Sequence, residues 1–191
     1  MTTPSERLQA CLGFTLQFEG GYQAREDDTG NWFDGRLIGT NFGISAPTLA
    51  AWRNEAGASV FLTDRDMQQL TVSEARAIYA VHYWNPVRGD DLPAGIDLLL
   101  FDFAVLAGPR RSVAIAQSVL ARLLGTITID GFMGPRTIGA IQRLSVRSLL
   151  PGVADAQLAF LKGLAAFPNN PGWVKRNAAR LKRATQMLEE A

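Results

Sequence analysis

Apolar residues recur at every third or fourth position along most of the chain, which is the spacing of an amphipathic α-helix. The first such segment places the following residues on one face: Leu8, Cys11, Leu12, Thr15, Phe18 and Glu19. Gly20-Gly21 predicts the end of this helix, because glycine readily adopts the left-handed conformation of a helix C-terminus. Further helices are expected at residues 47–52, 71–85, 110–124, 135–150, 153–167 and 171–190.

The segment from Pro93 to Gly108 is apolar on nearly every side of a helix, so we expect it to form a buried central helix. Asp97 and Asp102 interrupt this apolar segment. A buried acid needs an ion pair or hydrogen bonds to offset its loss of hydration. We therefore expect Asp102 to support the fold or a neighbouring site rather than to take part in chemistry.

Residues 23–41 replace the helical pattern with a long polar loop that carries Asp27, Asp28, Asp34 and three glycines. A loop of this length inside a compact domain is commonly functional. A strand-like rhythm appears at Ile127–Ile129, and a short ribbon is expected in the 30s. The sequence thus predicts a mainly α fold with a buried central helix and a short β-ribbon in the 23–45 region.

The 191 residues suffice for one domain or for one domain built of two lobes. We divide them into a catalytic lobe of residues 1–92 and a helical lobe of residues 93–191. With 19 basic and 18 acidic residues, the chain lacks the general positive field of a nucleic-acid-binding protein. A single cysteine and a single histidine exclude an internal disulfide, a cysteine-based zinc site and a histidine-rich metal cluster. We expect neither a metal nor an organic cofactor.

No apolar run approaches the roughly 20 residues of a membrane-spanning helix, so stable membrane insertion is not expected. The N-terminal residues lack the basic and then apolar pattern of a signal peptide. We therefore expect a protein made in the cytoplasm. A holin pore or a dedicated secretion system would have to carry it to any substrate outside the cytoplasm.

Glu19 is the first candidate for catalysis, because the helical spacing puts it on the apolar face at the carboxyl end of the first helix. Partial burial and the unpaired carbonyl groups of a helix end both favour the protonated form of a carboxyl group. A general acid must hold its proton near neutral pH. The alternative interpretation of the same spacing is a solvated helix end.

A second carboxylate is expected from the loop that follows Glu19. Asp28 lies nine residues after the acid, and Asp27 and Asp34 are its rivals. An ionised carboxylate stabilises an oxocarbenium-like centre or activates water in glycoside hydrolysis. The hydroxyl of Thr40 is a candidate for holding that water. Calcium binding is a weaker alternative, because the acidic spacing matches no EF-hand loop.

Several motifs follow one another in a characteristic order. They are Glu19-Gly20-Gly21-Tyr22, Asp27-Asp28-Thr29-Gly30, Thr40-Asn41-Phe42-Gly43-Ile44-Ser45, Tyr83-Trp84-Asn85-Pro86, Asp91-Leu92-Pro93 and Phe101-Asp102-Phe103-Ala104-Val105. Together they resemble the N-acetylmuramidase family of glycoside hydrolases known as family 108, which includes phage endolysins and secretion-linked muramidases. Further along, Asp130–Thr137 resembles the turn of peptidoglycan-binding domains, and Gly172-Trp173 resembles its closing motif.

The resemblance implies a lysozyme-like helical fold that cuts the β-1,4 bond between N-acetylmuramic acid and N-acetylglucosamine. It implies Glu19 as the catalytic acid, and glycan strands of peptidoglycan as the partner. It leaves the second carboxylate open: the distance from Glu19 favours Asp28, whereas the distance to Thr40 favours Asp34. We choose Asp28. For Asp130–Thr137, we favour structural support over wall binding.

Aromatic side chains commonly hold sugar rings, and we expect these residues to bind the substrate: Tyr22, Trp32, Phe42, Tyr83 and Trp84. Two other functions stay open at this point. A lytic transglycosylase would use a single acid and leave an anhydro sugar end. A non-catalytic wall-binding module would need no acid, although the intact Glu, Asp and Thr set argues against it.

Overall fold

The computed structural model describes residues 4–55 and 61–191, which form two compact units. The ribbon unit is Gly13–Tyr79, and the helical unit combines the chain before Gly13 with Ala80–Ala191. This division differs from the boundary at residue 92 that we expected from the sequence. The reason is that residues 80–92 pack against the central helix of the helical unit.

The ribbon unit contains two antiparallel hairpins. In one, β1 (Trp32–Phe33) pairs with β2 (Arg36–Leu37), and in the other β3 (Thr40–Asn41) pairs with β4 (Ile44–Ser45). Each is closed by a two-residue turn, Asp34-Gly35 or Phe42-Gly43, in which both residues have φ between 50° and 70°. These positive angles define a type I′ turn, whose twist matches that of the strands.

The other elements of the ribbon unit are η1 (Thr29–Asn31), α2 (Ala46–Glu55), α3 (Asp64–Gln68) and α4 (Val72–Tyr79). Arg53 on α2 connects the last two, because its guanidinium group lies 3.2 Å from Asp66 of α3 and 3.0 Å from Glu74 of α4. The predicted start of α4 is confirmed in part, since the Glu74 amide donates to Thr71 Oγ1. Of these helices, α2 packs against β1 and β4, and α3 packs against β3.

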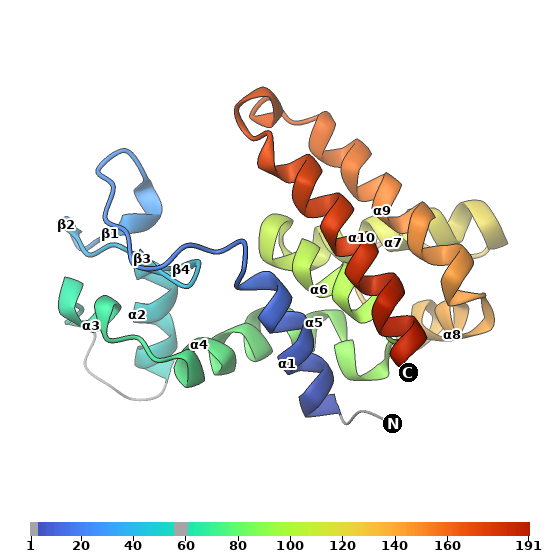
Figure 1. Ribbon diagram of the computed structural model, residues 1–191, viewed down its shortest axis with the longest axis horizontal. Coiled ribbons are helices and arrows are strands. Elements are labelled where there is room, and N and C mark those ends of the chain that lie inside the picture. Colours follow the sequence, from blue (N-terminus) through green and yellow to red (C-terminus); the bar gives the residue numbers. More distant parts are fainter. Residues whose placement is uncertain (1–3, 56–60) are drawn as a thin grey trace. The chain divides into compact units, whose positions relative to one another are not determined.

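The helical unit is built around α6 (Ile96–Ala107), in which every residue from Ile96 to Ala104 is buried. Around it pack α7 (Pro109–Leu124), α9 (Val146–Lys162) and α10 (Gly172–Glu190), and α9 and α10 run antiparallel side by side (Figure 1). The remaining elements are η2 (Ala80–Trp84), α5 (Asn85–Val87), η3 (Gly89–Asp91), α8 (Pro135–Arg143) and η4 (Phe167–Asn169), and α1 (Pro4–Thr15) enters the unit with its first part. The buried central helix predicted from the sequence is confirmed.

Asp102 on α6 is fully buried and is paired with two arginines of α10. Arg176 donates to both carboxylate oxygens, at 2.8 and 3.1 Å, and Arg180 donates at 2.8 Å. Burial alone would raise the pKa of Asp102, but the hydrogen bonds and charges of the two arginines outweigh it, so the pKa is lowered. The expectation that Asp102 has a structural partner is met, and the ion pairs join α10 to the core.

Asp97, the other acid of α6, contacts both the N-terminal end of α6 and Arg7 in the first part of α1. Its Oδ1 accepts the backbone N–H groups of Gly95 and Leu98, and its Oδ2 lies 3.4 Å from the Arg7 guanidinium. Arg7 also donates to the Leu92 carbonyl at 2.6 Å and to the Asp90 carbonyl at 2.8 Å. Burial raises the pKa of Asp97 to about 6, although the backbone N–H groups and Arg7 oppose the shift.

This shift predicts an unusual dependence of stability on pH. The folded pKa of about 6 exceeds the model-peptide value of 3.8. The favourable contribution of Asp97 is therefore complete below pH 3.8 and is lost as the pH rises to about 6. The loss should reach about 3 kcal/mol. Urea unfolding at several pH values should show the stability of the wild type falling by this amount relative to Asp97→Asn. A difference that stays constant, or that grows in favour of the wild type, would contradict the account.

Two prolines that we expected to end helices do not. The helix continues through Pro86 to Val87, because residues 80–84 adopt the wider π-helical turn. Arg88, with a φ of 54°, ends the segment instead. Pro151 lies inside α9, which begins after Ser145, so the predicted break at residues 151–152 is wrong. Its side chain is exposed, and the helix lacks the hydrogen bond of the missing N–H at this position.

The mainly α, lysozyme-like fold and the short ribbon within residues 23–45 are confirmed. The prediction of a strand at Ile127–Ile129 is wrong, because these residues belong to an irregular loop. Within the described parts of the chain, no helix has the length and apolar character needed to cross a membrane.

Candidate active site

Glu19 lies beyond the end of α1, in the irregular turns that follow Thr15. Its amide donates to the Thr15 carbonyl at 3.3 Å, and the Phe18 amide donates to the same carbonyl at 3.0 Å. The side chain is half-buried. The sequence predicted a helix that continues to Gly20-Gly21, but the regular helix ends at Thr15, so Glu19 lies four residues beyond it, where the chain turns toward the hairpins.

The turn of the β3–β4 hairpin lies directly against the Glu19 carboxyl group. A methyl group built on Gly43 would lie 2.5 Å from Glu19 Oε2 and 2.9 Å from Tyr79 Oη. Only glycine therefore leaves room for the acid at this position. The same hairpin carries Thr40 on its first strand, three residues before the glycine that lies against the acid.

Tyr79 fixes the conformation of this turn. Its side chain is buried, and its hydroxyl donates to the Phe42 carbonyl at 2.7 Å. Phe42 has a φ of 51°, which residues other than glycine rarely adopt, so the hydrogen bond stabilises a strained conformation. This role could not be predicted from the sequence, because nothing in a helical spacing identifies the distant carbonyl that a hydroxyl meets.

Thr40 is held by a small polar network. Its hydroxyl donates to Asn31 Oδ1, and Gln23 Nε2 approaches Thr40 Oγ1 at 3.4 Å. The backbones of Gln23 and Thr40 also pair at 2.8 and 2.9 Å. Since the hydroxyl proton is directed to Asn31, the oxygen of Thr40 presents a lone pair as an acceptor. This is the arrangement needed to hold a water molecule by one of its hydrogens.

Asn31 was missed by the sequence reasoning, although it organises the whole loop. It is completely buried, and its carbonyl accepts the amides of Ile38 and Gly39 at 2.8 and 2.9 Å. Its side-chain amide donates to the Arg25 carbonyl at 3.0 Å. A buried asparagine in a polar loop indicates a structural role, because its side-chain amide must form hydrogen bonds with the groups around it.

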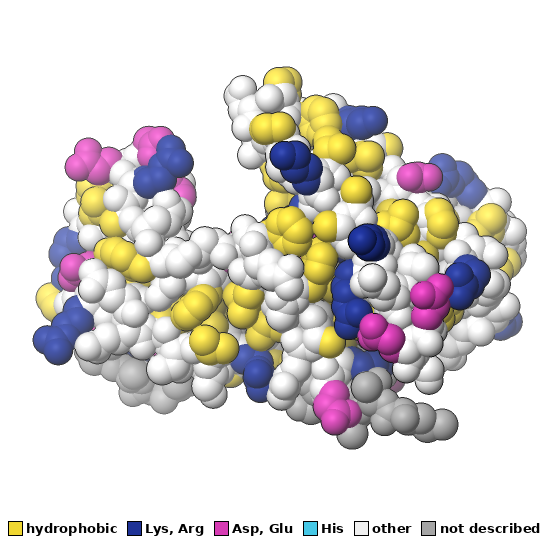
Figure 2. All heavy atoms as spheres, viewed as in Figure 1, with side chains coloured by type: hydrophobic (Ala, Val, Ile, Leu, Met, Phe, Trp, Pro, Cys, Tyr) yellow, Lys and Arg dark blue, Asp and Glu magenta, His cyan; other side chains and the backbone are white. Residues whose placement is uncertain are grey.

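The three acids of the loop differ sharply in their surroundings. Asp28 is half-buried and caps η1 by accepting the Gly30 amide at 2.9 Å. Asp27 is exposed and paired with Arg25 at 2.6 Å, and hydrogen bonds from Arg25 lower its pKa. Asp34 occupies the β1–β2 turn, with its side chain 80% exposed. Acidic side chains gather on the surface over this part of the ribbon unit (Figure 2).

Of the aromatic candidates in the ribbon unit, Tyr22 and Trp32 are each 38% exposed, and Phe42 is half-buried. The Tyr22 hydroxyl donates to the Ile38 carbonyl at 3.3 Å, and Trp32 Nε1 donates to the Glu26 carbonyl at 3.1 Å. Both rings are therefore fixed at one edge. Fixed, partly exposed rings of this kind suit contact with a sugar face.

The other two aromatic candidates belong to the helical unit. Tyr83 is half-buried and makes an edge contact with His82. Trp84 is 2% exposed, packs edge-on against Phe101 and donates to Asp90 Oδ1 at 2.9 Å. Its ring therefore has no free face for a sugar, and we remove Trp84 from the set of candidate binding residues.

Comparisons with known proteins show the family to which the chain belongs. Residues 12–108 match the family Glycosyl hydrolase 108, and no curated relative matches the chain. The segment contains Glu19, Asp28 and Thr40. The chain belongs to the glycosyl hydrolase 108 family. Among solved structures, SagA of Brucella abortus is similar at 33% identity and a TM-score of 0.77, over 95% of each chain. This glycosyl hydrolase is therefore a glycoside-cleaving enzyme.

The contact between Gly43 and Glu19 gives a prediction with a matched control. Gly43→Ala should lower glycosidase activity by about 100-fold, because small displacements of a catalytic group have effects of this size. Gly35→Ala places alanine in the same type of turn, at a φ of 69° against 70°, but nothing lies within 4 Å of the added methyl group. Both variants thus carry similar backbone strain. Equal activity of the two variants on cell-wall glycan would show that the contact has no catalytic importance.

Proposed function

We propose that the chain is an N-acetylmuramidase, which hydrolyses the β-1,4 bond between N-acetylmuramic acid and N-acetylglucosamine in peptidoglycan. The observation that carries the proposal is the position of Glu19, whose carboxyl group rests against the hairpin that also presents Thr40. The arrangement occurs in a chain of a glycosyl hydrolase family. Glycoside hydrolysis uses an acid that protonates the leaving oxygen and a second carboxyl group that activates water or stabilises the developing charge.

In the proposed mechanism, Glu19 donates its proton to the glycosidic oxygen as the bond to the sugar C1 atom breaks. The positive charge that develops on the sugar is stabilised by the carboxylate of Asp28. A water molecule held by the oxygen of Thr40 attacks C1, and its proton passes to a carboxylate. Asp28 is the favoured second acid, since Asp27 is engaged by Arg25 and Asp34 lies at an exposed turn.

Substrate binding is proposed for the partly exposed rings of Tyr22 and Trp32, which lie in the same unit as the acid. Each ring offers an apolar face to the axial hydrogens of a sugar. Phe42 contributes through its backbone, which shapes the turn against Glu19. Tyr83, in the helical unit, stays a prediction from the sequence alone. The glycan strand is thus the proposed partner.

The test is the chemical identity of the ends that the enzyme produces. Purified sacculi would be digested with the full chain, and the released fragments analysed by mass spectrometry. Hydrolysis predicts reducing N-acetylmuramic acid ends. Fragments one water lighter, with anhydro ends, would identify a lytic transglycosylase, and binding to sacculi without release of fragments would identify a non-catalytic wall-binding module.

A further inference from the structure

Gln23 lies beside Thr40 in the ribbon unit, and the proposed mechanism gives it no part. The backbones of the two residues exchange hydrogen bonds at 2.8 and 2.9 Å as an isolated antiparallel bridge. Residues that oppose each other in such a pair carry their side chains on the same face. The Gln23 side chain accordingly reaches the Thr40 hydroxyl, with Nε2 3.4 Å from Oγ1. Gln23 is exposed, so the amide next to Thr40 is open to water and substrate.

The direction of the hydrogen bonds at Thr40 is set by the buried Asn31. The side-chain nitrogen of Asn31 donates to the Arg25 carbonyl at 3.0 Å, so its Oδ1 atom faces Thr40. A carboxamide oxygen only accepts hydrogen bonds, so the Thr40 hydroxyl must donate to it. The Thr40 oxygen is thereby left as an acceptor. The group of Gln23 that faces it must then be the amide nitrogen rather than the amide oxygen, as the structure has it.

These contacts leave one hydrogen-bonding position of Thr40 open. A hydroxyl group has one donor position and two acceptor positions. The donor position is used by Asn31, and Gln23 Nε2 uses one acceptor position. Within residues 4–55 and 61–191, no other group bonds to the Thr40 hydroxyl. A water molecule can therefore donate to the Thr40 oxygen from one direction, and Gln23 limits which direction that is.

The backbone holds Gln23 in this place independently of its side chain. A methyl group built on Gly39 would lie 2.6 Å from the Gln23 carbonyl, so the two chain segments are in close contact. The distance from Nε2 to Thr40 Oγ1 exceeds the value of about 2.9–3.0 Å that is usual for an N–H···O hydrogen bond. Such bonds are often long in unliganded enzymes and shorten when the substrate binds.

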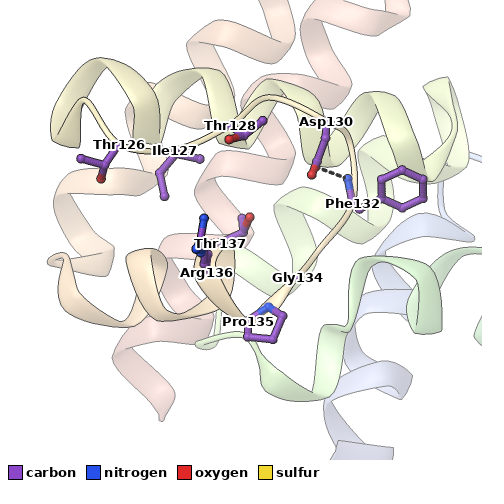
Figure 3. A pocket seen from close by; sticks show the side chains of 9 residues that line it. All are labelled: Thr126, Ile127, Thr128, Asp130, Phe132, Gly134, Pro135, Arg136 and Thr137. Atoms are coloured by element: carbon purple, nitrogen blue, oxygen red, sulfur yellow. Dashed lines mark hydrogen bonds between the residues drawn. The ribbon is translucent and has the colours of Figure 1, made fainter.

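A glutamine with a structural role has different surroundings, as Gln117 of α7 shows. Gln117 is buried, and its side-chain oxygen accepts the Asp130 amide at 3.1 Å. Its nitrogen donates to Asp130 Oδ1 at 2.8 Å and to the Phe132 carbonyl at 2.9 Å. These bonds fix a loop at the wall of a pocket, where Asp130 also accepts the Phe132 amide (Figure 3). Gln23 is exposed instead, and among the described residues its side chain bonds to Thr40 alone.

We propose that Gln23 is a positioning residue for the attacking water. Its amide nitrogen keeps the Thr40 oxygen in the role of acceptor and occupies one of its two lone pairs. Water then donates to the other lone pair and turns its own oxygen toward the sugar C1 atom, while its second proton passes to the carboxylate of the proposed mechanism. The inference rests on the proposed function. Gln23 acts through Thr40 and makes no contact with the sugar.

The test reverses the polarity of the amide. Gln23→Glu keeps the size of the side chain, but at pH 7 its carboxylate cannot donate to Thr40 and competes with Asn31 for the hydroxyl proton. We expect kcat on peptide-free glycan strands to fall about 30-fold, with KM unchanged, because water rather than sugar loses its contact. Near pH 4 about half of the new carboxyl groups are protonated and can donate, so the loss should shrink to about threefold.

Gln68→Glu is the matched control, on an exposed glutamine at the end of α3 in the same unit. It introduces the same charge, so the rate of Gln23→Glu relative to this control cancels the pH dependence of the catalytic groups. A second variant, Gln23→Met, keeps the length of the side chain without its polarity. It should lower kcat about fivefold at both pH values. Thermal unfolding shows whether each variant is folded.

Equal kcat of Gln23→Glu and Gln68→Glu, or a loss of the same size at pH 7 and pH 4, would overturn the proposal. Wild-type kcat in Gln23→Met would do the same, and this variant decides the matter if Gln23→Glu does not fold. A raised KM with unchanged kcat would show that Gln23 binds the sugar instead. All of these results need an active wild type. A wild type that releases no reducing ends would remove the proposed function itself, and this inference with it.

Discussion

Replacement of Glu19 by glutamine is expected to lower the rate of glycan hydrolysis by about 10²–10⁴-fold, the usual contribution of a general acid. Glutamine has nearly the same size as glutamate, so it fits against Gly43 and the fold should be kept. It has no proton of suitable acidity to give to the leaving oxygen. The measurement is the rate of reducing-end release from purified sacculi, with thermal unfolding as the check on folding.

The matched control for this variant is Glu55→Gln, at the exposed end of α2 in the same unit. It removes the same charge from the same kind of residue, so it should keep wild-type activity. If Glu19→Gln retains more than a tenth of the wild-type rate, Glu19 is not the acid. If both variants lose activity alike, net charge rather than the position of the carboxyl group is responsible.

Replacement of Asp102 by asparagine should destabilise the helical unit by about 3–5 kcal/mol, because removing one partner of a buried ion pair leaves the other charges without compensation. Arg180 is fully buried and Arg176 nearly so, and both donate to the Asp102 carboxylate. Burial already lowers the pKa of Arg180, which shows how much the site disfavours an unpaired charge. Urea unfolding gives the free-energy difference directly.

The control for this measurement is the exposed pair of Arg88 and Asp91, whose side chains are 45% and 44% exposed. Asp91→Asn removes a carboxylate from a similar 2.7 Å contact in the same unit. It should cost less than about 1 kcal/mol, since water screens and solvates exposed ions. An Asp102→Asn variant no less stable than Asp91→Asn would mean that the buried network contributes nothing net.

The sequence predicted features that depend on local pattern. The unbroken apolar segment around Leu98 predicted the buried α6, and the helical spacing before Gly20-Gly21 predicted a first helix close to Glu19. The Asp34-Gly35 and Phe42-Gly43 pairs lie at the hairpin turns of the expected ribbon. Each of these features is encoded within about ten neighbouring residues, so a single sequence is enough to find it.

Contacts between distant residues could not be predicted in this way. The bond from Tyr79 to the Phe42 carbonyl joins positions 37 residues apart, and the burial of Trp84 depends on Phe101 and Gly89. An aromatic residue has the same local pattern whether it lies in a core or on a sugar. Likewise, Pro86 was assigned to a helix end because its effect depends on the π-helical turn that precedes it.

The central claim is that this chain hydrolyses the glycan with the proton of Glu19, and digestion of sacculi in heavy-oxygen water tests it most directly. The account predicts that the wild type places one heavy oxygen at C1 of each new muramic acid end. Glu19→Gln should produce almost no such ends. Unlabelled anhydro ends from the wild type, or labelled ends formed equally fast by Glu19→Gln, would contradict it.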